Sequence, residues 1–341
     1  MEFIPTKTLS ELTREFKYRL YTIAKSDNSI TGIPSGFEKL DAITKGFQPS
    51  NLIMVGGVEG MGKTSFALSL IHKMAIENQC PTAFFSLEMT NQQLMMGIIR
   101  QQTNISVEKL CSGLLNEDEI ALVSKKTAAF ENTPLDVYDY PFLTVSDIED
   151  ALLFSTPDFA QIIIIDSLQF IAKSKKDQVG KVLNKGEMTQ ITFQLKKLAE
   201  KFNTTIIVLF HFRLPKEKLR YYYSKRPILA DVRKYAPIDT YADLVLLLYR
   251  PEYYKIEEWD DDEQSSTAGE SEIIVAKNNS GILDSVRIKF DGKKGEFDNS
   301  PKLKKTKRNS NNPFKTVTLP SPNSDFESKL RDDDDDLNPL A

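Results

Sequence analysis

Short apolar runs alternate with segments of helical periodicity along most of the chain, which indicates an α/β fold. The apolar runs predict strands at Leu52–Val55, Thr82–Leu87, Leu135–Tyr138, Gln161–Asp166, Thr205–Phe210, Leu244–Tyr249, Glu272–Ala276 and Ser285–Phe290. Apolar residues at three- and four-residue steps predict helices at Gln92–Gln101, Glu117–Phe130, Val145–Phe154 and Lys185–Phe202. Such alternation is typical of a mainly parallel sheet with helices on both faces. Because the last strands lie closer together, we expect an antiparallel edge.

The two ends of the chain have patterns of their own. Residues 9–25 carry an apolar stripe at helical spacing, formed by Leu9, Leu12, Phe16, Leu20 and Ile23. This helix would pack either on its own core or on a neighbouring subunit, and the pattern favours neither. From about residue 300 the chain is basic, then rich in Ser, Asn and Pro, then acidic at Asp332–Asp336. We expect a disordered tail there; a peptide that binds a protein partner is the alternative.

Composition narrows the class of protein. No apolar run approaches the roughly 20 residues that span a bilayer, and no secretory signal opens the chain. The two cysteines, Cys80 and Cys111, have no metal-binding spacing. We therefore expect a cytoplasmic protein without membrane contact. The net charge is −4, so any nucleic-acid surface must be local rather than global.

A glycine-rich loop follows the first predicted strand and precedes helical spacing. It reads Gly57-x-x-x-x-Gly62-Lys63-Thr64, the P-loop pattern. Glycines let backbone N–H groups surround phosphate oxygens, while Lys63 reaches the β- and γ-phosphates and the Thr64 hydroxyl binds Mg²⁺. Glu59 should repel a triphosphate unless it points outward. We predict an ATP site formed by Gly57, Val58, Glu59, Gly60, Met61, Gly62, Lys63, Thr64 and Ser65.

Carboxylates follow two other predicted strands. Glu88 comes at the end of the second strand, where it would face the nucleotide crevice. It is our candidate general base for the water that attacks the γ-phosphate. Asp166 ends a run of four isoleucines and would hold Mg²⁺ together with Thr64. Gln169 follows closely and is a further candidate for contact with the same site.

His211 ends a third apolar strand, and a cationic segment comes after it. The histidine could sense the γ-phosphate, although a lone histidine is as often structural. The segment 213–226 surrounds three tyrosines, Tyr221 to Tyr223, with Arg213, Lys216, Lys218, Arg220, Lys225 and Arg226. Cations follow a phosphate backbone and tyrosines stack on bases, so we predict a surface for single-stranded DNA. A second basic loop, with Lys173, Lys175, Lys176, Lys181 and Lys185, follows the Asp166 strand.

The order of these motifs resembles the ATPase domain of bacterial replicative DNA helicases of the DnaB type, within the RecA-like group. The similar stretch runs from about Leu9 to Asn299. The motifs are Thr31-Gly-Ile-Pro-Ser-Gly-Phe-Glu-Lys-Leu-Asp41, Met61-Gly-Lys-Thr64, Ser86-Leu-Glu-Met89, Asp166 with Gln169, Lys225-Arg-Pro227, Asp231-Val-Arg233, Ala242-Asp-Leu244, Tyr249-Arg250 and Ile273-Ile-Val-Ala-Lys277.

The resemblance implies a RecA-like P-loop fold and a hexameric ring that hydrolyses ATP with Mg²⁺ and translocates on single-stranded DNA. It implies Glu88 as the catalytic base and DNA contacts in the central pore from Arg233 and Lys234. It also implies that the helix within residues 1–30 is a linker that docks on a neighbour, with the ATPase domain at 31–299 and the tail at 300–341.

The chain departs from the family pattern at four places. We expect the family's amino-terminal helical domain, which carries primase contacts, to be lacking, because only the linker-like helix precedes the core. His211 replaces a glutamine, and Lys234-Tyr-Ala236 replaces Glu-Ser-Gly. The Lys-x-Arg that reaches a neighbour's nucleotide reads Lys277-Asn-Asn279, so the lysine stays at the subunit boundary and the arginine finger is missing. Such a finger contributes about 10³–10⁵ in rate, which predicts weakened or partner-dependent hydrolysis.

Two alternatives to a DNA helicase remain open at this stage. One is a RecA-fold ATPase without helicase activity, such as a recombination mediator or a switch of the KaiC or RadA kind. The other is an interaction protein that binds ATP to hold an oligomer together and hardly hydrolyses it. Glu59 and the missing finger favour the second alternative.

Overall fold

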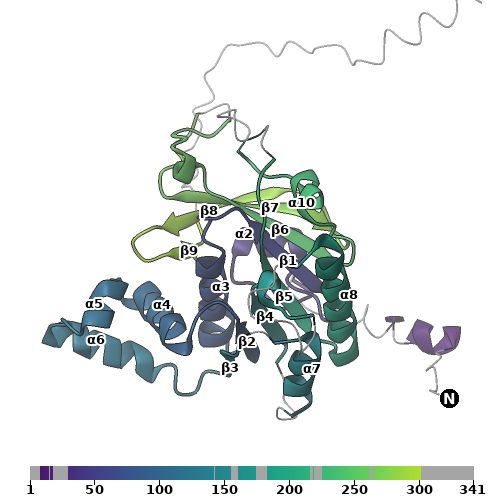
Figure 1. Cartoon of the computed structure of the whole chain (residues 1–341), viewed down its shortest axis with the longest axis horizontal. Coiled ribbons are helices and arrows are strands. Elements are labelled where there is room, and N and C mark those ends of the chain that lie inside the picture. Colours follow the sequence, from purple (N-terminus) through teal and green to yellow (C-terminus); the bar gives the residue numbers. More distant parts are fainter. Residues whose placement is uncertain are drawn as a thin grey trace, which may run out of the picture. The chain divides into compact units, whose positions relative to one another are not determined.

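The strands of the computed structural model form one mixed sheet (Figure 1). The structure describes residues 8–14, 16–17, 30–141, 143–154, 160–173, 183–215, 218, 225–261 and 264–300. Within these residues the strand order is β3-β2-β4-β5-β1-β6-β7-β8-β9. The strands are β1 (Leu52–Gly57), β2 (Thr82–Ser86), β3 (Leu135–Tyr138), β4 (Ile162–Asp166), β5 (Thr205–His211), β6 (Leu244–Tyr249), β7 (Glu270–Asn278), β8 (Ser285–Asp291) and β9 (Glu296–Asp298). The first six are parallel and the last three antiparallel, which confirms the predicted arrangement.

Helices flank both faces of this sheet. They are α2 (Glu38–Thr44), α3 (Lys63–Ile71), α4 (Asn91–Thr103), α5 (Val107–Ser112), α6 (Glu117–Ala128), α7 (Val145–Phe154), α8 (Lys185–Phe202) and α10 (Leu229–Tyr235). A π-helical turn, η1 (His72–Glu77), extends α3, and short 3-10 turns form η2 (Leu168–Phe170) and η4 (Pro251–Tyr254). Reciprocal capping boxes begin α4, α6 and α8 at Thr90, Asn116 and Asn184. Each box satisfies backbone N–H groups that the first turn leaves unpaired.

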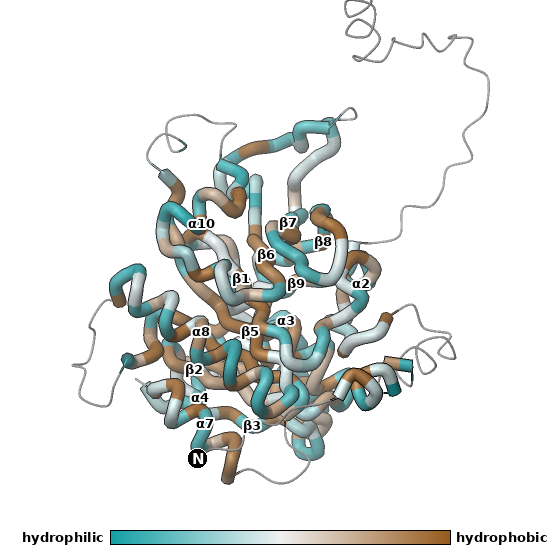
Figure 2. The backbone as a smooth tube through the Cα atoms, turned by 90° about the vertical axis from the view of Figure 1, so that its right-hand side faces the viewer, coloured by the Kyte–Doolittle hydropathy of each residue, from teal (hydrophilic) through white to brown (hydrophobic). Residues whose placement is uncertain are grey.

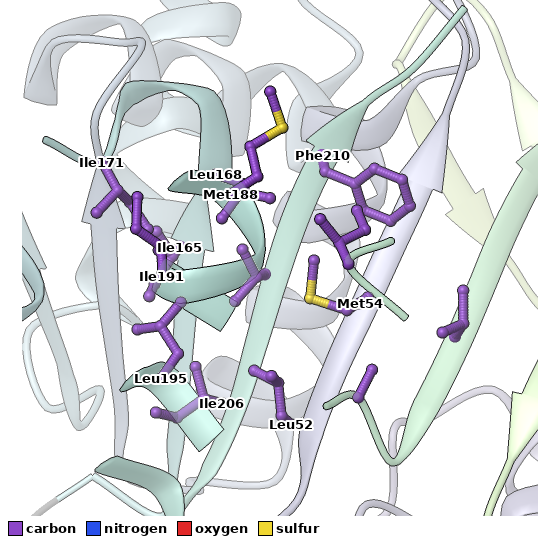
Figure 3. Close-up of a cluster of buried hydrophobic side chains, with 14 of the residues drawn as sticks. Leu52, Met54, Ile165, Leu168, Ile171, Met188, Ile191, Leu195, Ile206 and Phe210 are labelled. Atoms are coloured by element: carbon purple, nitrogen blue, oxygen red, sulfur yellow. The ribbon is translucent and has the colours of Figure 1, made fainter. Parts of the chain in front are cut away.

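Alternate residues of each strand enter two hydrophobic cores. Ile163 and Ile165 of β4 pack with Leu195 of α8 in one core, part of which Figure 3 shows. Ile162 and Ile164 lie in the other core, on the side of α3 and α4. All five β4 residues are buried, as expected for a parallel strand covered on both faces. Hydrophobic stretches accordingly follow the central strands β5 and β6 in Figure 2.

The sheet brings the carboxyl ends of several strands to one edge. Gly57 at the end of β1 is paired in register with His211 of β5, and Ser86 of β2 is paired with Asp166 of β4. The chain runs from β1 through α3 to β2 on one side, while β6 pairs with the other side of β1. Such a change of direction opens a crevice beyond the carboxyl ends of the strands.

The described part of the amino-terminal segment is helical at residues 9–14 and 16–17. Thr8 and Glu11 cap it reciprocally, with backbone N–H to side-chain oxygen distances of 2.7 and 3.3 Å. Its apolar residues Leu9, Leu12 and Phe16 are exposed by 80%, 47% and 61%. The remainder of the predicted stripe, Leu20 and Ile23, and the tail from residue 301 lie outside the described residues. None of the described helices combines the length and apolar character needed to cross a bilayer.

Candidate active site

The glycine-rich loop connects β1 to α3. Gly60 and Gly62 have φ values of 81° and 83°, which glycine adopts without a steric cost. Gly62 is the N-cap of α3, so the unpaired N–H groups and the positive dipole end of this helix point toward the loop. The ring of Tyr253 covers Gly60 so closely that an added Cβ would lie 2.4 Å from Cζ. The loop backbone can therefore cradle an anion, as the sequence predicts.

Lys63 lies buried inside this loop. Its side chain donates from Nζ to the carbonyl oxygen of Val58 at 2.9 Å, and the residue is 5% exposed. Burial lowers the pKa of Lys63 to about 8, while Asp166, Glu88 and Glu59 favour its charged form. Glu59 is exposed, so the expected repulsion of a triphosphate is reduced by solvent. A phosphate beside Lys63 would favour the charged ammonium further.

Asp166 and Thr64 meet at the carboxyl edge of the sheet. The Thr64 hydroxyl donates to Oδ2 of Asp166 at 2.8 Å, and Asp166 is 1% exposed. Oδ1 of Asp166 is buried and has no hydrogen-bond partner among the described residues. Burial, reinforced by the nearby charge of Glu88, raises the pKa of Asp166 to about 6, although the hydrogen bond from Thr64 opposes this.

This pair of oxygen ligands fits Mg²⁺. Magnesium is bound in proteins by one or two carboxylates together with substrate phosphates, and it keeps several waters. The orphaned Oδ1 of Asp166 offers such a ligand, and the Thr64 hydroxyl lies next to it. The described residues contain no group of three or more His, Cys, Asp or Glu side chains that would hold a metal alone, so the phosphates would have to complete the site.

Glu88, His211 and Gln169 form a second polar group at the same edge. Nε2 of His211 lies 3.5 Å from Oε2 of Glu88, and this contact holds the pKa of Glu88 below its ordinary value, against the effect of burial. Gln169 instead grips the backbone of His211. Its Nε2 donates to the His211 carbonyl oxygen at 2.7 Å, and its Oε1 accepts from the His211 N–H at 3.2 Å.

The predicted DNA-binding cations are distributed differently from the expectation of one open surface. Lys218 pairs with Asp231 at 2.6 Å and Arg226 with Glu272 at 2.7 Å. Arg233 pairs with Asp239 at 2.8 Å, although 60% of its side chain is exposed. Arg213 and Lys234 are exposed without a printed charge partner. Lys216, Arg220 and the three tyrosines, like Lys175, Lys176 and Lys181 of the second loop, lie outside the described residues.

The sequence analysis assigned no role to Arg250 and Tyr253, which lie against the loop. Arg250 donates from Nη1 to the Gly60 carbonyl oxygen at 3.0 Å, and its guanidinium lies 3.7 Å from the centre of the Phe290 ring. Both residues line a groove of 670 Å³. The signal was their place directly after β6, whose carboxyl end lies at the same edge of the sheet.

The position of the missing arginine finger is held within the chain. The N–H of Asn279 donates to the Asp243 carbonyl oxygen at 2.9 Å. Lys277 donates from Nζ to the carbonyl oxygen of Asp239 at 2.9 Å. The lysine expected at the subunit boundary is therefore engaged with its own chain.

Comparisons with known proteins place these features in context. Residues 32–299 match the model of the DnaB-like helicase C-terminal domain family. The chain is 32% identical over 298 residues to a probable replicative DNA helicase of Trieres chinensis, covering 86% of this chain and 62% of that protein. It is 32% identical over 265 residues to the replicative DNA helicase DnaB of Geobacillus stearothermophilus, covering 77% and 56%. The chain thus spans roughly three-fifths of the length of these relatives.

Solved structures are similar in fold. A DnaB-like replicative helicase, described with its interactions with primase, gives a TM-score of 0.72 at 25% identity, over 87% of this chain and 68% of that chain. A helicase ATPase domain, covered completely, gives a TM-score of 0.74 at 24% identity. The predicted RecA-like P-loop fold is confirmed.

Replacing Asp166 should expose the cost of its burial. Because its folded-state pKa is raised from 3.8 to about 6, the stability it contributes is present at low pH and is lost as pH rises through about 6. Asp166→Asn does not titrate, so its free energy of unfolding relative to wild type should improve by about 1 kcal/mol between about pH 5 and about pH 7.5. Urea unfolding without nucleotide measures this difference. An equal difference at both pH values would contradict the assignment.

Proposed function

The chain belongs to the DnaB-like helicase C-terminal domain family, and from this premise we propose that it is an ATP-dependent DNA helicase or translocase acting on single-stranded DNA. The observation that carries the proposal is the meeting of Lys63, Thr64 and Asp166 at one edge of the sheet, with Thr64 bonded to Asp166 at 2.8 Å. We further propose a cytoplasmic homo-oligomer, most simply a hexameric ring. It would be divided into a linker helix (1–30), an ATPase domain (31–299) and a tail (300–341).

Each residue of this edge has a role in the proposed hydrolysis. Thr64 and Asp166 would hold Mg²⁺, directly or through water, and the bound ion neutralises charge that develops on the phosphates. The backbone of Gly57–Ser65 and the ammonium of Lys63 would bind the phosphate oxygens. Glu88 would orient the attacking water and accept its proton. His211 touches Glu88 and would report whether a γ-phosphate is present.

The groove beside the loop suits the nucleoside. Tyr253 and Arg250 line it together with Phe290 and offer an aromatic ring and a planar cation. Both groups stack on a purine base. Because Tyr253 also covers Gly60, a base on this ring would lie next to phosphates in the loop. We propose that this groove holds the base and ribose of ATP.

The DNA contacts would come from Arg213, Lys234 and the outward part of Arg233, with Lys216 and Arg220 as further candidates. Lys218 and Arg226 would contribute chiefly by holding the segment, because both pair with carboxylates of this chain. The acidic tail would serve a protein partner. Neither primase contact nor ring geometry can be derived from the described residues.

One observation favours a second candidate function. Asn279 stands where the family pattern has its arginine and is bonded to Asp243, and Lys277 is engaged with Asp239. Without a finger, a ring would bind ATP and hydrolyse it slowly. The second candidate is therefore an oligomer that uses ATP mainly to hold its subunits together.

The glutamate and the lysine should separate turnover from binding. Glu88→Gln is expected to keep ATP affinity within about twofold of wild type and to lower kcat by at least about 100-fold, the typical contribution of a general base. Lys63→Ala is the comparison variant and should lose ATP binding itself. Fluorescent-nucleotide titration and steady-state phosphate release measure the two properties. Intact turnover in Glu88→Gln would assign the base elsewhere.

Restoring the arginine should test the weakened hydrolysis. Asn279→Arg is expected to raise kcat by at least about tenfold, a fraction of the 10³–10⁵ that a finger supplies, at concentrations where the oligomer forms. Asn278→Arg adds the same charge one residue earlier and should leave kcat near the wild-type value. Equal rates in both variants and wild type would show that the missing finger does not limit turnover.

The base groove can be tested apart from the phosphate site. Tyr253→Ala should weaken ATP binding by about tenfold through lost stacking, while Tyr253→Phe should retain most of it. Inorganic triphosphate lacks a base, so its affinity should be the same in all three proteins. Calorimetric titration measures both ligands. A parallel loss of triphosphate affinity would mean that Tyr253 supports the loop rather than the base.

A further inference from the structure

We infer that Tyr235 is a positioning residue that couples the nucleotide site to α10, the helix that carries Arg233 and Lys234. The inference rests on the proposed function, in which these two cations lie on the DNA-binding side of the protein. It concerns a contact for which the family pattern gives no precedent, because Lys234-Tyr-Ala236 is one of the places where this chain departs from that pattern.

The link begins at the catalytic edge. Nε2 of His211 lies 3.5 Å from the carboxylate of Glu88, while its backbone N–H and carbonyl are both held by the Gln169 amide. Gln169 belongs to η2, three residues after Asp166. Its side chain thus joins the ends of β4 and β5, the two strands that carry Asp166 and His211.

The link then crosses to α10. Nε2 of Gln169 also lies 3.4 Å from the Tyr235 hydroxyl oxygen. An amide nitrogen carries two hydrogens, so one can bond the His211 carbonyl while the other is directed at Tyr235. Gln169, Tyr235 and the His211 side chain are all partly buried, which limits competition from water. A shift of His211 toward or away from a γ-phosphate would therefore change the bond that Tyr235 receives.

The other polar anchors of α10 lead away from the nucleotide. Asp231 is bonded to Lys218, and Arg233 to Asp239 in the turn after the helix. The carbonyl oxygen of Lys234 accepts from Lys185 at 2.8 Å. Among the contacts of the described residues, the Tyr235 hydroxyl is the one through which α10 reaches a group bonded to His211. Its hydroxyl is the natural place for the two sites to influence one another.

The coupling is measurable as a ratio of DNA affinities. Single-stranded DNA affinity of the full chain would be titrated with a non-hydrolysable ATP analogue and with ADP. Tyr235→Phe removes only the hydroxyl and should reduce the ratio of the two affinities by about twofold to fivefold, the range expected for one hydrogen bond. Tyr241→Phe is the matched control. Tyr241 stacks on Phe193 with ring centres 5.0 Å apart, and this control should preserve the ratio.

The outcomes distinguish this inference from the proposed function. An unchanged ratio in Tyr235→Phe, beside a wild-type ratio clearly different from one, would overturn the coupling role and leave the proposed function intact. An equal loss of DNA affinity in both nucleotide states would also overturn it, because Tyr235 would then only stabilise α10. A wild-type ratio of one, or no DNA binding by wild type, would overturn the proposed function and the inference with it.

Discussion

The buried carboxylate of Asp166 is the constraint on which the rest of the site depends. Four isoleucines carry β4 through the sheet with no exposed residue, so the carboxylate at its end is 1% exposed. A charge in such a place is costly unless it is paired or binds a metal. The Thr64 hydroxyl meets one oxygen, and Lys63, itself buried, supplies a charge nearby. The second oxygen has no partner, so the nucleotide-free site keeps an electrostatic cost that a divalent cation would remove.

This arrangement requires that the loop and α3 be fixed relative to β4. The buried amide of Gln101 in α4 donates to the carbonyl oxygens of Ser65, at 3.1 Å, and Gly295, at 2.6 Å. The ring of Phe66 packs on Phe297 with centres 5.6 Å apart. The first turn of α3 is thus held to the β8–β9 hairpin. A cradle fixed in this way does not have to be ordered when phosphate binds, which lowers the entropic cost of binding.

The predictability of the site follows the range of the interactions involved. Strands and the loop were predicted because local periodicity and glycine spacing determine them, and parallel topology then brings Glu88, Asp166 and His211 to one edge. Arg250 and Tyr253 were not assigned a role, because only the packing of η4 on the loop brings them to Gly60. The pairing of Arg226 with Glu272 was not foreseen for a related reason, since 46 residues separate them and no sequence pattern marks the pair. The residue pattern likewise could not show that Gln169 holds the backbone of His211.

The ion pairs also change how the cationic segment should be understood. A net charge of −4 already requires any DNA surface to be local, and Glu272, Asp231 and Asp239 neutralise part of that local charge. These carboxylates are nearly buried, whereas the Arg233 side chain is 60% exposed, so Arg233 can approach a phosphate without leaving Asp239. A guanidinium can serve both partners because it offers five donors in a fixed plane. The pairs therefore act as supports that orient the cations, and the strength of DNA binding would depend on how α10 is held rather than on the number of basic residues.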